Sequence, residues 1–279
     1  FILPKPIITR HNPATKLEGT TSGILSIGQA EGLVGNQICT QAADTLGSIW
    51  FSTERGLSKY DGDIFKTYNF LSKSPEGNLE LILDLSIDKD GNLWVVANIS
   101  GLYKIDLTRE IVEHYELGAG FLRIQKDHHG IIWLANLNRG IFFLNSDRSS
   151  IHQLVLPIEK IERVVTYGVF EDTHDNLWIG YANKLAIINS DRNSIRLIGK
   201  DDGLAINVPY EFTEDTTGKV WISAFARGAK SISLAEGKIY ELGPKQGFFG
   251  ASRDVVLDPM QRIWIIDNDT VYLYNQRSN

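Results

Sequence analysis

Short apolar runs separated by turns rich in Asp and Gly repeat along the whole chain. Each of six runs carries one tryptophan, and neighbouring tryptophans lie 39 to 45 residues apart. An aspartate stands six residues before every one of them, and a glycine stands three residues before four of them. A tryptophan signature with a period of about 40–45 residues is typical of the four-stranded blades of a β-propeller. The pattern predicts an all-β propeller of six antiparallel blades, whose signature residues are Trp50, Trp94, Trp133, Trp178, Trp221 and Trp264.

The first repeat shows how the four strands divide. Alternation and apolar runs predict strands over residues 37–43, 48–53, 56–60 and 64–69, with turns at 44–47 and 61–63. Asp suits such turns because its side chain bonds nearby backbone amides, and Gly because it accepts a positive φ. The later repeats divide in the same way, with outer strands predicted at 111–115, 151–154, 195–198 and 238–242. The tryptophans, each on the second strand, are expected to pack between blades.

The two ends of the chain complement each other in this pattern. Residues 1–22 hold three prolines and no alternation, and we interpret them as an extended strap or linker outside a single propeller domain over 23–279. Residues 23–33 match 194–204, which end the fourth repeat, whereas the sixth repeat stops after a third strand at 270–274. We therefore expect residues 24–27 to be the outer strand of the sixth blade and to close the ring. A parent chain continuing past Asn279 would allow a seventh blade.

Composition narrows the class of protein. Hydrophobic residues make up 43% and charged residues 22%, the net charge is −6, and no run of five Lys or Arg occurs. This pattern argues against nucleic acid or an anionic membrane surface as the main partner, and no run of 18 apolar residues suggests a span. Cys39 is the only cysteine and lies in a predicted strand, so we expect a buried structural thiol and no disulfide. The chain begins at Phe1, which indicates a processed protein or a piece of a longer one.

One repeat resembles a known family. Gly47-Ser-Ile-Trp-Phe-Ser-Thr53, followed by Gly56-Leu-Ser-Lys-Tyr-Asp-Gly62 and preceded by Glu31-Gly-Leu33, is similar to the two-component regulator propeller repeat. The resemblance covers about residues 23–275. It implies the extracytoplasmic, periplasmic sensor domain of a bacterial hybrid histidine kinase that is anchored in the inner membrane. Many such regulators respond to carbohydrate. The resemblance also implies dimerisation through a longer parent chain, with any kinase activity outside this segment. Family members usually have seven blades, so six repeats are a departure.

Candidate binding residues follow from the loops. In a propeller, the loops between the second and third strands and between one blade and the next share the face at the channel mouth, where ligands usually bind. Amides and guanidiniums there supply directional hydrogen bonds, and Phe121, Phe248 and Phe249 offer aromatic faces for a sugar. Converging arginines would favour an anionic ligand such as a uronate-containing oligosaccharide, although they could equally point to solvent. The candidate residues are Arg55, Asn98, Asn136, Arg139, Asn183, Tyr210, Arg227 and Arg253.

Histidine placement argues against catalysis. Lyases on related propellers need a histidine base and metal-binding carboxylates at the mouth, but His128, His129 and His174 fall in first turns and His114 and His152 on outer strands. We expect no catalytic residue, no metal and no cofactor. The His128-His129 pair could hold an ion, but the pattern favours a solvated turn.

Three classes of function remain open. A ligand sensor for a small molecule or oligosaccharide is favoured by the resemblance. A non-catalytic protein-interaction scaffold would need an exposed apolar patch, for which Phe248 and Phe249 are the seed. A propeller lyase or hydrolase would have to bring Glu54, Glu80 and Asp267 together.

Overall fold

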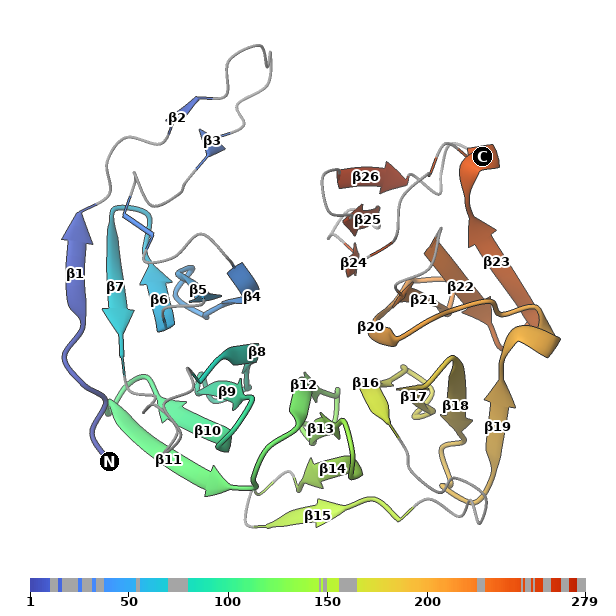
Figure 1. Cartoon of the computed structure of the whole chain (residues 1–279), viewed down its shortest axis with the longest axis horizontal. Coiled ribbons are helices and arrows are strands. Elements are labelled where there is room, and N and C mark those ends of the chain that lie inside the picture. Colours follow the sequence, from blue (N-terminus) through green and yellow to red (C-terminus); the bar gives the residue numbers. More distant parts are fainter. Residues whose placement is uncertain are drawn as a thin grey trace. The chain divides into compact units, whose positions relative to one another are not determined.

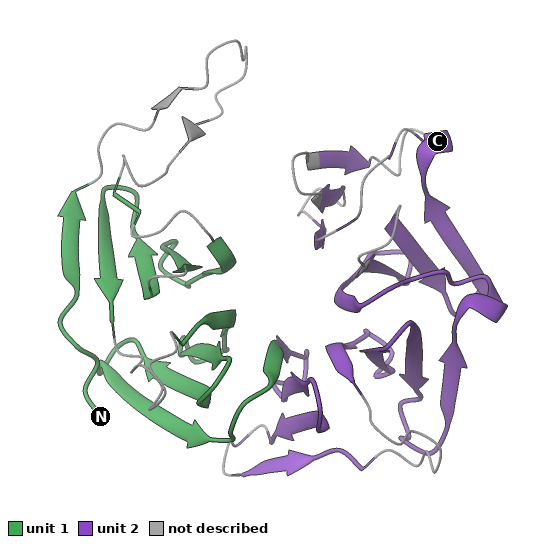
Figure 2. Ribbon diagram, in the orientation of Figure 1, with its two compact units in different colours: residues 1–124 green, residues 125–279 purple. Residues whose placement is uncertain are grey.

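The computed structural model describes the chain in two compact units, residues 1–124 and 125–279 (Figure 2). The described residues are all those outside 11–14, 17–24, 27–31, 34–37, 54–55, 70–79, 146, 148–149, 156–164, 225–228, 247, 249–251, 253, 258–261, 267–270 and 275–279. The boundary between the units falls inside strand β12.

The first unit contains two antiparallel sheets and a short hairpin (Figure 1). Its first sheet has the order β1 (Ile7–Arg10), β7 (Ile64–Tyr68), β6 (Gly56–Tyr60), β5 (Ile49–Thr53) and β4 (Ile38–Ala43). Its second sheet has the order β11 (Ile111–Glu116), β10 (Gly101–Asp106), β9 (Leu93–Ala97) and β8 (Ile82–Ile87). The hairpin pairs β2 (Thr15–Lys16) with β3 (Leu25–Ser26).

The second unit contains four antiparallel sheets. Three have four strands each. The first has the order β12 (Phe121–Lys126), β13 (Ile132–Asn136), β14 (Gly140–Leu144) and β15 (Ile151–Gln153). The second has the order β16 (Thr166–Glu171), β17 (Leu177–Tyr181), β18 (Lys184–Ile188) and β19 (Ile195–Ile198), and the third β20 (Pro209–Glu214), β21 (Lys219–Ala224), β22 (Ala229–Ser233) and β23 (Lys238–Leu242). The fourth has three described strands, β24 (Asp254–Leu257), β25 (Ile263–Ile266) and β26 (Val271–Tyr274). Two 3-10 turns follow outer strands, η2 (Lys200–Asp202) and η3 (Pro244–Gln246).

Each sheet is a meander of strands in chain order, which is the blade of a β-propeller. The predicted all-β class and the six blades are confirmed, with three strands of the last blade described. Strand bounds agree closely with the sequence pattern: β6, β19 and β23 coincide with the predicted ranges, and β4, β5 and β7 differ by one residue at one end.

A hydrogen-bonded Asp–Trp clamp recurs in every blade where both residues are described. The Oδ2 atom of the aspartate accepts the indole Nε1–H of the tryptophan six residues later, at 3.2, 2.8, 2.7, 2.8 and 2.8 Å in successive repeats. The Oδ1 atom accepts the backbone N–H four residues later, in the same turn. The turn role predicted for the aspartates is thus confirmed, and the indole bond is an additional role. The pairs are Asp44–Trp50, Asp88–Trp94, Asp127–Trp133, Asp172–Trp178 and Asp215–Trp221.

The clamped tryptophans also pack between neighbouring blades of the same unit. Trp50 shares a core cluster with Leu85 and Leu93 of the second blade, and Trp178 shares one with Phe212 and Val220 of the fifth blade. Both indoles are at most 1% exposed. Because the ring is buried while its N–H is paired, the blade gains apolar burial without an orphaned donor. The predicted inter-blade role is confirmed here.

Glycine allows two blades to approach closely at the inner strands. A Cβ atom added to Gly180 on β17 would lie 1.9 Å from the carbonyl oxygen of Pro209 on β20, and one added to Gly168 on β16 would lie 2.4 Å from that of Tyr210. Neither separation is physically accessible to a side chain. Gly168 and Gly180 are therefore required where the fourth and fifth blades meet.

The N-terminal segment pairs along the outside of the first unit. Ile7–Arg10 forms β1, a fifth strand of the first blade, in register with Thr67 to Ile64 of β7. Ile2 makes an isolated bridge to Ile111 at the start of β11. All four side chains of β1 are exposed, so the sequence shows no alternation of apolar and polar residues there. The strand pairs through main-chain hydrogen bonds. Whether residues 23–279 form one domain stays a prediction.

Of residues 24–27, predicted to close the ring, the structure describes Leu25–Ser26, which pairs with Thr15–Lys16 of β2. Pairing of this segment with the sixth blade stays a prediction. The match between residues 23–33 and 194–204 does persist at Leu33 and Leu204, which are 6% and 0% exposed and follow glycines with positive φ.

Three side-chain predictions are corrected. Cys39 is exposed on β4. Phe121 and Phe248 are buried, at 0% and 3% exposure, so neither offers a face to a ligand or partner. Phe248 instead packs edge-on against Tyr272 at 4.4 Å between ring centroids.

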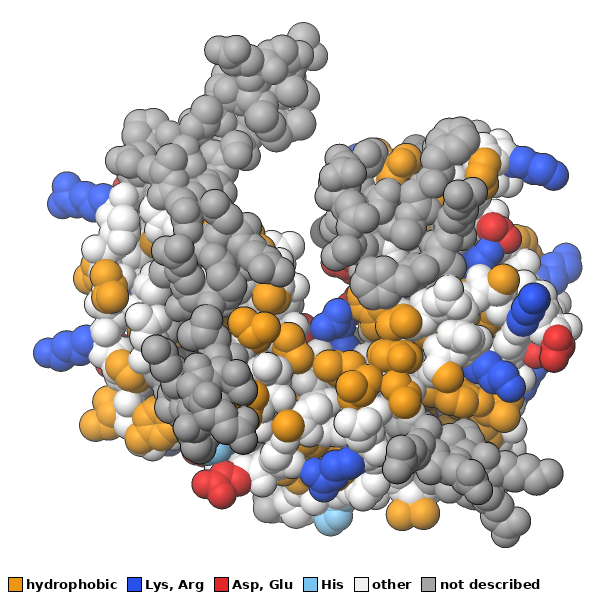
Figure 3. All heavy atoms as spheres, in the orientation of Figure 1, with side chains coloured by type: hydrophobic (Ala, Val, Ile, Leu, Met, Phe, Trp, Pro, Cys, Tyr) orange, Lys and Arg blue, Asp and Glu red, His pale blue; other side chains and the backbone are white. Residues whose placement is uncertain are grey.

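The described surface has no single-sign field of charge on the face drawn in Figure 3. On the face that Figure 3 shows, Lys and Arg side chains are scattered among uncharged and hydrophobic ones. Within the described part of the chain, no helix has the length and apolar character needed to cross a bilayer.

Candidate functional site

The fourth blade carries a surface pocket of about 440 Å³. It lies where the loop between β17 and β18 meets the loop that follows β19, so two loops predicted to share a face do so in this blade. Residues of both charge signs and amides surround a small apolar floor that includes Ile206, which is 4% exposed. The lining residues are Asn183, Lys184, Leu197, Gly199, Lys200, Asp201, Asp202, Ala205, Ile206 and Asn207.

The pocket is shaped by the turn η2. Gly203 has φ 89° and donates its N–H to the Lys200 carbonyl, which ends the turn. The Asp202 Oδ2 atom accepts the Gly199 N–H at 2.9 Å. These bonds engage the Asp202 carboxylate within its own turn and fix the backbone that carries Lys200 and Asp201. The side chains of Lys200 and Asp201 are exposed.

The predicted mouth residues differ in their surroundings. Arg55, Arg227 and Arg253 lie outside the described residues, as do Glu54 and Asp267. Asn183 is exposed and lines the pocket, together with Asn207, which the loop analysis also places on this face. Tyr210 is half-buried on β20. The predicted convergence of arginines stays a prediction.

Other predicted residues have local roles. The Asn98 Oδ1 atom accepts the Leu81 N–H at 2.8 Å. The Oδ1 atom of fully buried Asn136 accepts the amides of Asn138 and Arg139, both at 3.0 Å. The Arg139 guanidinium lies 4.8 Å over the ring of Phe142 in the same blade. Short polar side chains shape turns in this way, which loop position alone does not separate from ligand binding.

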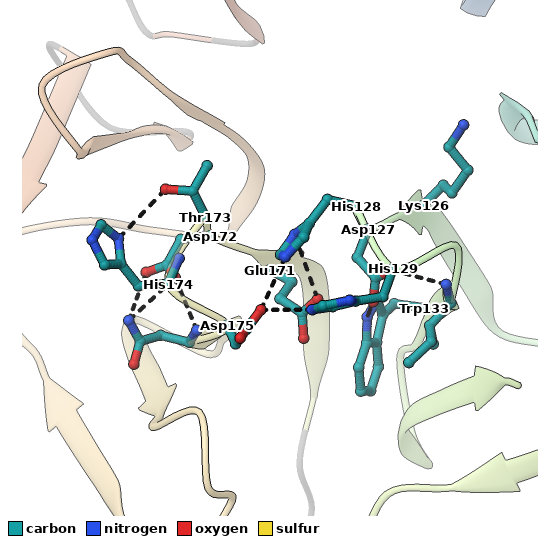
Figure 4. Close-up of polar contacts among 12 residues, drawn as sticks. Lys126, Asp127, His128, His129, Trp133, Glu171, Asp172, Thr173, His174 and Asp175 are labelled. Carbon is teal, nitrogen blue, oxygen red and sulfur yellow. Dashed lines mark hydrogen bonds and ion pairs between the residues drawn. The ribbon is translucent and has the colours of Figure 1, made fainter. Parts of the chain in front are cut away.

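A second cluster of functional groups lies at the opposite ends of the strands, in the turns that follow β12 and β16 (Figure 4). Nε2 of His128 and Nε2 of His129 lie 3.0 and 2.8 Å from the same Oδ1 atom of Asp175. Nδ1 of His128 lies 4.0 Å from Oε2 of Glu171. One possible ligand atom from each of these four residues lies within 4.8 Å of the other three. Spacing did not reveal this convergence, because the carboxylates come from the next repeat.

Burial and charge make Glu171 unusual in this cluster. Its side chain is 2% exposed, and its Oε1 atom accepts a bond from Arg192 Nη2. Burial first, and then the neighbouring Asp127 carboxyl, raise the pKa of Glu171 to about 7, against the lowering effect of Arg192. By contrast, the bond from His129 lowers the pKa of the exposed Asp175 carboxyl, and the same bond raises the pKa of His129.

The sequence did contain one signal for this cluster. The third residue after the aspartate of the turn is glycine with positive φ in the first, second, third and fifth repeats, but Asp175 takes that place in the fourth, at φ 63°. A left-handed conformation costs an L-residue about 1–2 kcal/mol relative to glycine. The departure from glycine thus falls on the residue that contacts both histidines.

The fold places the chain among the β-propellers, a class with sensors, scaffolds and enzymes. No protein-family model matches it, and no curated protein matches it by sequence. Among solved structures it is similar to the extracellular domain of BT4673 from B. thetaiotaomicron, described as a hybrid two-component system, at 15% identity and TM-score 0.59, over 88% of this chain and 39% of that one. The chain thus spans well under half of that extracellular domain.

Other neighbours have different roles. Virginiamycin B lyase from Staphylococcus aureus, solved with quinupristin, matches at 16% identity and TM-score 0.67, over 85% of this chain and 84% of that one. PorZ, a surface component of the type-IX secretion system of Porphyromonas gingivalis, matches at 13% identity and TM-score 0.64, over 86% of this chain and 38% of that one. Identities this low establish the shared fold only.

Proposed function

We propose that this chain is the extracytoplasmic, ligand-binding sensor propeller of a bacterial two-component regulator and that its ligand is an oligosaccharide. The observation that carries the proposal is the pocket on the fourth blade, built from the two loops expected to form the binding face. Support for the signalling role comes from the repeat resemblance and from the fold shared with the BT4673 extracellular domain. Kinase activity would belong to a different part of the parent protein.

The pocket has the chemistry that a sugar requires. Its volume of about 440 Å³ lies within the roughly 300–1,000 Å³ usual for small-ligand sites. Asn183 and Asn207 each offer an amide donor and acceptor for hydroxyl groups, and Lys184 and Lys200 offer cationic donors. Asp201 and Asp202 balance the charge of these lysines, so the lining supplies charged donors and acceptors for sugar hydroxyl groups, and the screen below includes both neutral and acidic sugars.

The histidines bear on the alternative of a lyase. Those that the structure describes lie in first turns (His128, His129, His174) or on outer strands (His114, His152), away from the pocket loops. A general base of the kind expected for a propeller lyase is therefore not found among the described histidines near this pocket. We propose binding without turnover.

A thermal-shift screen tests the proposal. Chelator-treated protein is heated with neutral and uronate-containing oligosaccharides, because a ligand that binds only the folded state stabilises it by about 2.7 kcal/mol at 100 times its Kd. One glycan class should raise the Tm, and the mixture should contain no cleavage product. Lys200→Ala and Asn207→Ala should each remove most of the shift, whereas Asn193→Ala, an exposed asparagine in the β18–β19 turn of the same blade, should keep it.

Three outcomes would contradict the proposal. Product formation would make the chain an enzyme. A shift that survives both pocket variants would move the ligand elsewhere, and no shift with any glycan would remove the carbohydrate assignment.

A further inference from the structure

The cluster at the β12–β13 and β16–β17 turns joins two blades of the second unit. His128 and His129 come from the third blade, while Glu171 ends β16 and Asp175 lies in the next turn of the fourth. Figure 4 shows both imidazoles directed at the two carboxylates across the gap between the turns. The centroids of the two imidazole rings lie 4.0 Å apart, and both rings contact the Asp175 carboxylate.

Both turns are held in place by the fold. Asp127 accepts the Trp133 indole N–H at 2.7 Å and the Ile131 N–H at 2.8 Å, which fixes the backbone that carries the histidines. Arg192 donates to the Asp175 carbonyl and to Glu171 Oε1, and its guanidinium lies 5.7 Å over the Trp133 ring. The four side chains therefore project from a preorganised frame and not from a free loop.

Glu171 provides an independent sign that something belongs between these groups. Its side chain is 2% exposed, and among the described residues its Oε2 atom has no hydrogen-bond partner. This atom faces His128, whose Nδ1 is 4.0 Å away, too far for a hydrogen bond. A buried carboxylate oxygen without a partner is costly, so it calls for a proton donor or a cation.

We propose that His128, His129, Glu171 and Asp175 bind a divalent transition-metal ion of the zinc class. Two imidazole nitrogens and two carboxylate oxygens are donors that Zn²⁺ accepts, whereas Mg²⁺ and Ca²⁺ prefer oxygen alone. A tetrahedral ion with bonds of about 2.0–2.2 Å holds its donors about 3.3–3.6 Å apart. The two His Nε2–Asp175 Oδ1 separations, 2.8 and 3.0 Å, are shorter than that value, and the four donor atoms, one from each residue, lie within 4.8 Å of one another, so movements of about 1 Å complete the site.

The arrangement is that of a structural site. Four protein ligands leave no position open for substrate, and they tie the third blade to the fourth. The histidines and Asp175 are 45%, 55% and 44% exposed, which gives an ion access from solvent, while Glu171 closes the inner side. Three carboxyl groups, counting Asp127, surround the point against the single guanidinium of Arg192, so the local charge favours a cation.

Titration calorimetry with Zn²⁺ tests the proposal on this chain. We expect one ion per molecule for the wild type. His128→Ala/His129→Ala should weaken the affinity by more than about 100-fold, since loss of even outer partners of a metal ligand costs 10–100-fold. Asp175→Asn, which keeps the shape and tolerates positive φ, should weaken it at least about 10-fold. Glu171→Gln should do the same, and its Tm in chelator reports whether it folds.

Two matched controls locate the ion. His174→Ala removes a histidine from the same β16–β17 turn but outside the four, and Cys39→Ser removes the exposed thiol. Both should bind Zn²⁺ as the wild type does. The proposal is overturned if the wild type binds no Zn²⁺ or if the double histidine variant keeps its affinity. Equal weakening by His174→Ala would also overturn it, because the ion would then be held by the surface in general.

Discussion

The turn between β12 and β13 and the turn between β20 and β21 share the same Asp, Gly and Trp contacts, which are called the frame here, but they carry different residues at their two central positions. In both, an aspartate (Asp127, Asp215) accepts the indole N–H of its tryptophan, at 2.7 and 2.8 Å. In both, a glycine with φ near 80° donates its N–H to the carbonyl of that aspartate. The two positions between them are His128-His129 in the first turn and Thr216-Thr217 in the second.

The comparison separates what the fold requires from what it leaves open. The aspartate, the glycine and the tryptophan satisfy buried polar groups and backbone geometry, so they recur with the blade. The two residues between them differ from turn to turn while the frame stays the same. Thr217 bonds back to Asp215 within its own turn, whereas His128 and His129 contact the next repeat. Repeated residues thus indicate structure here, and departures from the repeat indicate function.

Removal of the shared aspartate should have the largest effect. Asp215→Ala leaves the buried Trp221 indole N–H and the amides of Thr217 and Lys219 without their acceptor. We expect a loss of about 2–4 kcal/mol in the free energy of unfolding, measured by urea denaturation. Asp127→Ala should cost somewhat less, because Asp127 also opposes ionisation of the buried Glu171.

Thr216→Ala is the control for this pair, because Thr216 is exposed in the same turn. Its effect should stay within about 0.5 kcal/mol. If Asp215→Ala were as mild as Thr216→Ala, the clamp would not be the element that fixes these turns.

Asp175→Gly should sharpen the comparison by returning the fourth repeat to the common pattern. Relief of positive φ is worth about 1–2 kcal/mol, and the lost exposed contacts to the histidines about 0–1 kcal/mol. The free energy of unfolding in chelator should thus stay level or rise, while Zn²⁺ affinity in calorimetry falls. A variant that is clearly less stable without metal would show that Asp175 serves structure instead.

The first repeat predicts a smaller, pH-dependent effect. Burial opposes ionisation of Asp44, but the bonds from Lys59, the Ser48 amide and Trp50 prevail and hold the pKa of this carboxyl below its usual 3.8. A depressed folded-state pKa stabilises the fold above the unfolded value and loses that contribution as pH falls through the folded value.

Urea denaturation of the wild type and Asp44→Asn between pH 6 and pH 3 measures this contribution. The stability gap between them should be constant above about pH 5 and narrow below about pH 4. A gap that stays constant to pH 3 would mean that the carboxylate charge does not matter to this clamp.

The sequence predicted the blades well because period, turn residues and apolar runs are local signals. Strand β6 matches its predicted range, and five of the six tryptophans are buried as expected. The errors concern what lies beside a strand. Cys39 is exposed on β4, and Phe248 is buried beside Tyr272. The surroundings of these two side chains cannot be found from spacing along the chain.

The two sites differ in the same way. Loop positions were enough to place Asn183 and Asn207 on one face, where the pocket lies. The histidine cluster was missed because Glu171 and Asp175 lie more than 40 residues from His128, and only the packing of two blades brings them together. Asp175 in a glycine position was the available sign.

The central claim is that the residues that depart from the repeat pattern form a metal site. X-ray absorption at the zinc edge tests it most directly, on protein loaded with one equivalent of Zn²⁺. The account predicts nitrogen and oxygen ligands at about 2.0–2.1 Å with the scattering pattern of two imidazoles. This signal should disappear in His128→Ala/His129→Ala. A sulfur ligand at about 2.3 Å would place the ion on Cys39, and a shell of water alone would show that the four side chains hold no metal.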